Sequence, residues 1–156
     1  MSIWLVFKVA HVVAILFGVG LSLGTEVLLY RIARSNQVPL IRAGFSLAAP
    51  LLKAAPVMYL LGLQMGLLTV WAGGWSFVAP WLVISYCLFA LMIFLNVRFR
   101  APWVKRVLTA ARESSDSEPS GPLRATLGDR RATIHMYVAP VAILAQAFLM
   151  IVKPFG

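Results

Sequence analysis

The chain of 156 residues is 61% hydrophobic, only 12% of its residues are charged, and its mean hydropathy is +0.87. A water-soluble domain of this length could not cover so much apolar surface, so the composition excludes an ordinary soluble globular fold. The net charge of +9 is concentrated between apolar segments, and the single cysteine, Cys87, excludes a disulfide framework and a paired-thiol metal site.

Four segments are long and apolar enough to cross a hydrocarbon layer about 30 Å thick as helices. In chain order they are residues 2–30, 46–71, 77–97 and 133–152. The first is too long for a secretory signal and no small-residue cleavage pattern follows it, so we expect it to be a retained span. The sequence therefore predicts an all-α integral membrane bundle, in which residues 1–156 form a single four-helix transmembrane domain.

The basic residues predict how this bundle lies in the membrane. Arg31, Arg34 and Arg42 fall in or near the first connection, and the third connection carries eight more arginines and lysines, whereas the second, AGGWS, carries none. Positively charged short loops stay cytoplasmic, which predicts an up-down-up-down, multi-pass protein of a bacterial inner membrane with both termini on the periplasmic side. The same charges predict contact with anionic lipids at the cytoplasmic face. Nucleic acid is not an expected partner, because the basic residues flank membrane spans and no recognisable binding fold is present.

The connections and the aromatic residues agree with this arrangement. Residues 112–130, within ARESSDSEPSGPLRATLGDRR, mix Ser, Pro, Gly and charges, which predicts a flexible cytoplasmic loop that a short surface helix could precede. Aromatic rings gather at membrane interfaces. We expect Trp4, Trp71, Trp75 and Trp81 at the outer interface and Tyr30 and Trp103 at the inner one.

Polar residues within the spans carry the functional signal, because each costs a few kcal/mol in hydrocarbon unless it faces the bundle or finds a partner. On the first span, one arc of about 100° contains Lys8, His11, Ser22, Thr25 and Glu26. On the second span, an arc of about 40° contains Arg42, Ser46, Lys53 and Gln64. Both stripes are expected to face the interior of the bundle.

Helical rise sorts these residues into two layers. His11, Gln64 and Gln146 would lie about 9–12 Å from the outer end of their spans. A second layer on the cytoplasmic side would hold Glu26, Lys53, Asn96 and His135. Glu26 and Lys53 have similar depths, and opposite buried charges are best explained as a pair, so we predict a structural Glu26–Lys53 ion pair.

His11 is the candidate ligand for haem b or a metal ion, because neutral imidazole is a common ligand for both and four-helix bundles build such sites from inward side chains. Lys8, Gln64 and Gln146 would shape this cofactor-binding site. His135 lies about 13 Å deeper than His11, so the two are not expected to be axial ligands of one haem. The alternative is that His11 is only hydrogen-bonded to Gln64 or Gln146.

Other motifs narrow the choice of chemistry. The glycines of GVGLSLG have no strand before them, so they predict a close helix contact rather than a phosphate loop, as do Gly62 and Gly66 on the second span. A Ser/His/Asp arrangement, paired carboxylates and a nucleotide-binding loop are all missing from the sequence, which argues against a hydrolase or an ATP-driven pump and disfavours an enzyme in general.

The segment IWLVFKVAHVVAILFGVG places a lysine three residues before a histidine and glycines a few turns later, and an arginine cluster follows. With the four-span layout and the closing LMIVKPFG, the sequence resembles, over essentially its whole length, the uncharacterised integral membrane family called domain of unknown function 2269. It is more distantly similar to the copper-resistance D proteins and to the HemJ type of protoporphyrinogen oxidase, a haem-binding membrane protein. The latter resemblance implies a functional pair of His11 and a lysine on a later helix, but Lys53 lies in a different context, LLKAAP. Haem b near His11 is therefore favoured more than porphyrin oxidation.

Two functions remain open at this point. One is a haem- or metal-binding membrane protein with a redox or transport-related role centred on His11. The other is an accessory structural subunit of a larger respiratory or photosynthetic membrane complex, in which the polar stripes only hold helices together.

Overall fold

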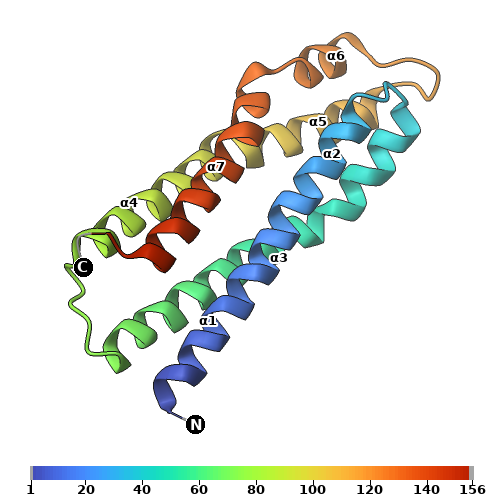
Figure 1. Cartoon of the computed structure of the whole chain (residues 1–156). Coiled ribbons are helices and arrows are strands. Elements are labelled where there is room, and N and C mark those ends of the chain that lie inside the picture. Colours follow the sequence, from blue (N-terminus) through green and yellow to red (C-terminus); the bar gives the residue numbers. More distant parts are fainter. Residues whose placement is uncertain (1, 155–156) are drawn as a thin grey trace.

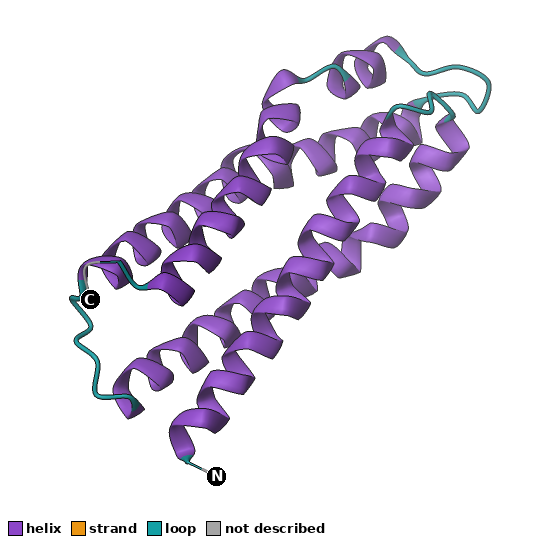
Figure 2. Cartoon of the chain, in the orientation of Figure 1, coloured by secondary structure: helices purple, strands orange, loops and turns teal. Residues whose placement is uncertain are grey.

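The computed structural model describes residues 2–154, which are almost entirely helical and contain no strand (Figures 1 and 2). In chain order the elements are α1 (Ile3–Val19), the π-helical segment η1 (Gly20–Gly24), α2 (Thr25–Ala33), α3 (Val38–Ala72), α4 (Pro80–Leu95), the π-helical segment η2 (Asn96–Arg100), α5 (Ala101–Glu113), α6 (Gly121–Leu127) and α7 (Arg130–Val152). The two π-helical segments continue the helices on either side of them, so α1 runs into α2 and α4 runs into α5.

Four helical stretches are long and apolar enough to cross a membrane, which confirms the predicted all-α bundle. They are Ile3–Ala33, Val38–Ala72, Pro80–Glu113 and Ile134–Val152. The third is longer than the predicted segment because the helix does not stop where the apolar run stops. At 1.5 Å per residue its 34 residues exceed the thickness of a hydrocarbon layer, so α5 must extend beyond that layer.

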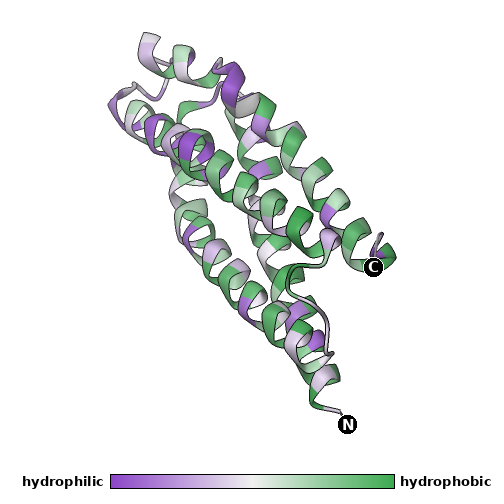
Figure 3. Cartoon of the chain, turned by 90° about the vertical axis from the view of Figure 1, so that its left-hand side faces the viewer, coloured by the Kyte–Doolittle hydropathy of each residue, from purple (hydrophilic) through white to green (hydrophobic). Residues whose placement is uncertain are grey.

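The bundle consists of two helix pairs. The first span lies along α3, and α4 lies along α7, as the two views in Figures 1 and 3 show. Glycine makes the first pairing close: a Cβ at Gly62 of α3 would lie 2.6 Å from Cδ1 of Ile15 on α1. This confirms the close helix contact predicted for Gly62. Gly20 and Gly24, by contrast, face open space and lie within η1.

The two ends of the bundle differ in composition. One end, which we call the terminal end, holds the start of α1, the loop between α3 and α4 and the end of α7 (Figure 1). The other end, which we call the basic end, holds α2, α5 and α6, and hydrophilic residues gather there (Figure 3). The basic end also contains the larger buried core, in which the rings of Phe45 and Trp103 meet edge to face at 5.5 Å.

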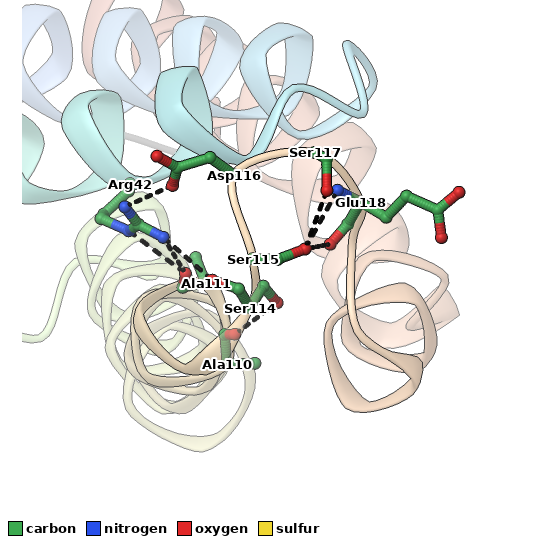
Figure 4. Close-up of polar contacts among 8 residues, drawn as sticks. All are labelled: Arg42, Ala110, Ala111, Ser114, Ser115, Asp116, Ser117 and Glu118. Carbon is green, nitrogen blue, oxygen red and sulfur yellow. Dashed lines mark hydrogen bonds and ion pairs between the residues drawn. The ribbon is translucent and has the colours of Figure 1, made fainter.

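The segment 112–130, predicted as a flexible loop, contains a helix of its own. Leu123 of α6 is fully buried in the core of the basic end, and the Ser120 side chain caps the helix by accepting from the Leu123 amide. Arg42 of α3 holds the start of this segment: its guanidinium donates to the Ala111 and Ser114 carbonyls and pairs with Asp116 at 2.9 Å (Figure 4). The burial of Leu123 and the N-cap at Ser120 explain why the segment folds against α5.

Candidate functional site

A cluster of three ionisable side chains lies buried between the helices near the basic end. Glu26 of α2, 7% exposed, accepts a hydrogen bond of 2.7 Å at Oε1 from Nδ1 of His135 on α7. Its Oε2 lies 3.5 Å from Nε of Arg100, the last residue of η2. His135 and Arg100 are as well buried as Glu26. Three separate helices thus contribute one charged or titratable group each to a single site.

The Arg100 guanidinium is fixed by two further bonds. It donates to Oδ1 of Asn96 at 3.1 Å and to the Ser22 carbonyl at 3.3 Å. Asn96 and Arg100 belong to η2 and Ser22 to η1, so the two π-helical segments face each other across the cluster. π-helical turns inside α-helices are rare and occur frequently at functional sites. The cluster is therefore built where both long helices depart from α-helical geometry.

Glu26 also lines a cavity of about 180 Å³ that lies between α2, α5 and α7. The other polar and aromatic residues around this cavity are Tyr30, Arg34, Trp103 and Asp129. A wider hollow, lined by Arg34, Asn36 and Arg124, adjoins it. A space of this size has room for several water molecules. The buried carboxylate therefore borders a cavity of mixed polar and apolar lining at the basic end.

The structure gives Glu26 different partners from the predicted one. Lys53 is exposed on α3, and the ion pairs of Glu26 among the described residues are with Arg100 and His135. Helical rise predicts one layer for Glu26, Asn96 and His135, and these side chains do lie in one cluster. The counter-charge of Glu26, however, comes from Arg100 on the third span rather than from Lys53 on the second. In the sequence, Arg100 follows the predicted third span and counts only among the basic residues that predict orientation.

His11 lies in a second polar region, towards the terminal end. Its Nδ1 is 2.7 Å from the Gly62 carbonyl, and its ring lies against Gly66, where a Cβ would be 2.9 Å from Nδ1. A carbonyl only accepts, so in the neutral ring Nδ1 carries the proton and Nε2 keeps its lone pair. The hydrogen-bond partner of His11 is thus a backbone carbonyl of α3 rather than Gln64 or Gln146.

Among the described residues, no hydrogen bond joins His11 to the other predicted cofactor-binding residues. Lys8 lies over the ring of Trp4 at 4.8 Å, and Gln64 is exposed. Oε1 of Gln146 is buried without a hydrogen-bond partner, and so are the hydroxyls of Tyr86 on α4 and Tyr59 on α3. Within residues 2–154, His, Cys, Asp and Glu side chains form no group of three that could hold a metal ion.

Some of these positions could not be read from the sequence. Tyr59 lies in an apolar run and carries no sequence signal, yet its ring packs against Gly18, where a Cβ would lie 3.1 Å away. The partnership of His135 with Glu26 could have been suggested by their common depth alone. Sequence reasoning therefore found most of the polar residues but not their pairing.

The comparisons with known proteins give the family and nothing narrower. No curated protein and no solved structure matches the chain significantly. Residues 5–154 match a family described as predicted integral membrane protein, DUF2269, which is nearly the whole chain. Four apolar helices long enough to span a bilayer agree with that description. The chain belongs to the DUF2269 family of integral membrane proteins.

Proposed function

We propose that this protein has a transport-related role in a bacterial inner membrane, in which the Glu26–His135 pair takes up protons from the cytoplasm. One observation carries the proposal: a buried carboxylate, hydrogen-bonded to an imidazole at 2.7 Å, lines a cavity at the basic end. Ionisable residues inside membrane helices are rare, and proton relays are among their main uses.

The charges of the cluster suit proton uptake. The Arg100 guanidinium stays protonated and balances the Glu26 carboxylate, so the cluster is neutral overall when His135 is neutral. Imidazole is the side chain whose charge changes nearest neutral pH. A proton that enters through the cavity, past Tyr30, Arg34 and Asp129, adds a single charge to the cluster. The bonds from Arg100 to η1 and η2 hold the guanidinium in place meanwhile.

Beyond the Glu26–His135 pair, polar atoms without protein partners could carry the proton path on towards the terminal end. The hydroxyls of Tyr59 and Tyr86 and Oε1 of Gln146 are buried and unbonded, and they come from α3, α4 and α7. Buried polar atoms in proteins nearly always have a partner, and ordered water is the usual one when the protein provides none. These atoms support a hydrated interior through which a proton could continue.

Proton flux into liposomes tests the proposal. The purified chain is reconstituted with a trapped pH-sensitive dye, and a potassium diffusion potential drives protons inward. We expect flux above that of protein-free vesicles, and we expect His135→Gln, which keeps a hydrogen-bonding side chain and the Glu26–Arg100 pair, to abolish it. Glu113→Gln, at an exposed carboxylate on the end of α5, is the matched control and should conduct like the parent. Equal flux in the parent and His135→Gln would refute the proposal.

Haem b or a metal ion at His11 is a second candidate function, supported by the Nδ1–Gly62 bond. A second group that holds Nδ1–H orients an imidazole so that Nε2 can bind a metal, and this is the usual arrangement of histidine ligands. A bound haem would supply redox chemistry to the bundle. We expect a Soret band in the purified protein that His11→Ala removes and His135→Ala keeps. A missing band together with copurifying larger subunits would instead support an accessory subunit of a membrane complex.

The proposal places the basic end in the cytoplasm, in contact with anionic lipids. Eleven of the fourteen basic residues lie at that end, nearly all of them in helical turns of α2, α3, η2, α5, α6 and α7, and the positive-inside rule associates such a concentration of basic residues with the cytoplasmic side. Ser117 is exposed in the connection between α5 and α6. In a Cys87→Ser background, Ser117→Cys should react with a membrane-impermeant maleimide only after whole cells are opened. Labelling of intact cells would reverse the orientation.

A further inference from the structure

We propose that the terminal end binds the phosphate of an anionic phospholipid, through the ammonium groups of Lys8 and Lys153 and the indole N–H groups of Trp4 and Trp75. This site lies at the opposite end of the bundle from the Glu26 cavity and from the basic connections. It does not depend on the proposed proton uptake.

The first half of the site is a lysine held by two tryptophans. Lys153 follows the last residue of α7 and has a left-handed backbone, with φ of 48°. Its Nζ lies 3.0 Å from the centroid of the Trp75 ring and 5.7 Å from that of Trp81. The two rings meet edge to face at 5.3 Å. Aromatic rings attract the ammonium group by cation–π interaction but leave its N–H groups without an acceptor.

The second half of the site consists of Trp4 and Lys8 of α1. It adjoins the first half at Gly73, where the rings of Trp4 and Trp75 both pack. Lys8 lies over the ring of Trp4. A Cβ at Gly73 would lie 2.8 Å from Nε1 of Trp4 and equally close to Nε1 of Trp75, so both indole N–H groups border the small space that glycine leaves. Neither donates a hydrogen bond to another described residue, whereas Trp103 at the basic end donates to the Thr126 carbonyl. The four donors thus come from three parts of the chain, and the rings of Trp4 and Trp75 meet beside Gly73 with a lysine over each of them.

The chain has no carboxylate side chain to balance these charges. Its five acidic side chains are Glu26, Glu113, Asp116, Glu118 and Asp129. All of them belong to the basic end. Burial and, as a smaller contribution, the nearby charge of Lys8 lower the pKa of Lys153 from its ordinary value. Like charges brought together among neutral rings attract an anion.

A lipid phosphate fits the position better than a free anion. Tryptophan and lysine at helix ends sit at the depth of the headgroups, where a phosphate is always present. The surface beside the site is apolar, because Trp71, Phe77 and Val78 are exposed there. Such a surface can accept acyl chains while the lysines and indoles hold the headgroup. An anionic headgroup adds charge attraction that a zwitterionic one lacks.

Tryptophan quenching by brominated lipid tests the site, because four of the five tryptophans are at the terminal end. The full chain is reconstituted in phosphatidylcholine vesicles that contain either brominated phosphatidylglycerol or brominated phosphatidylcholine at equal mole fraction. We expect stronger quenching by the anionic lipid. Lys8→Gln and Lys153→Gln should each lower this preference about fivefold, the factor for one basic residue at a charged surface. Lys153→Arg should keep it.

Two controls decide between this site and its alternatives. Lys105→Gln removes an exposed lysine from α5 and should leave the preference unchanged. Inorganic phosphate is added to the protein in neutral detergent, and we expect no change in tryptophan emission at millimolar concentration. A change that Lys8→Gln abolishes would show that the ligand is free phosphate and overturn the lipid assignment. A preference that survives in both Lys8→Gln and Lys153→Gln, or that is missing in the parent, would overturn the site itself.

Discussion

The basic end and the terminal end of the bundle arrange their charges in opposite ways. At the basic end the buried Glu26 carboxylate faces both Arg100 and His135, and every ion pair found among residues 2–154 lies there. At the terminal end Lys8 and Lys153 lie among tryptophan rings, and none of the acidic side chains of residues 2–154 lies beside them. The Glu26 carboxylate thus has both of its charged partners within the chain, although its Oε2 accepts no hydrogen bond, whereas all five acidic side chains lie away from the lysines of the terminal end.

The largest effect is expected from removing the buried carboxylate of the basic end. Glu26→Ala would leave Arg100 buried without a counter-charge, because Asn96 and the Ser22 carbonyl supply only neutral oxygens. Removing one partner of a buried pair typically costs about 3–5 kcal/mol. We expect this loss in the free energy of unfolding, measured in mixed micelles of neutral detergent and SDS. Unchanged stability would mean that water molecules solvate the Arg100 guanidinium and that the Glu26 carboxylate is not needed to balance its charge.

The close pairing of α1 with α3 runs between the two ends and can be tested at Gly62. Gly62→Leu would push its side chain into Ile15, which a Cβ alone already approaches at 2.6 Å. Overpacking of this kind costs about 1–3 kcal/mol, and we expect the loss in the same SDS titration. Gly20→Ala is the matched control, because that position faces open space. Equal stability of both variants would show that the two helices separate easily.

Replacement of Lys53 should have a much smaller effect on stability than replacement of Glu26. The sequence assigned it to Glu26, but it is exposed on α3, so Lys53→Leu removes no buried counter-charge. We expect the unfolding free energy to change by less than about 0.5 kcal/mol, the usual range for exposed positions. A loss as large as that of Glu26→Ala would restore the predicted Glu26–Lys53 pair.

The error over Lys53 shows what the sequence could and could not predict. The four spans follow from apolar runs matched to the thickness of a bilayer, and they need no tertiary information. The depth of Glu26, Asn96 and His135 follows from helical rise alone. Their pairing depends on rotation about each helix axis, and η1 and η2 change that rotation by placing an extra residue in one turn. The polar layer at the basic end was therefore predictable, but Arg100 as the partner of Glu26 was not.

The smallest predicted effect concerns the pH dependence of the terminal end. The folded protein holds the pKa of Lys153 below its ordinary value, through burial and through Lys8, so the unfolded chain binds a proton more tightly at this position. Stability then rises with pH between the folded and the ordinary lysine pKa, and it gains nothing below that window. In neutral detergent we expect this alkaline rise in the parent and not in Lys153→Gln. An anionic lipid bound at the site would favour the charged ammonium and raise its pKa. Added phosphatidylglycerol should therefore flatten the rise in stability with pH, whereas phosphatidylcholine should leave it unchanged. A rise that persists with both lipids would show that no lipid phosphate binds at Lys153.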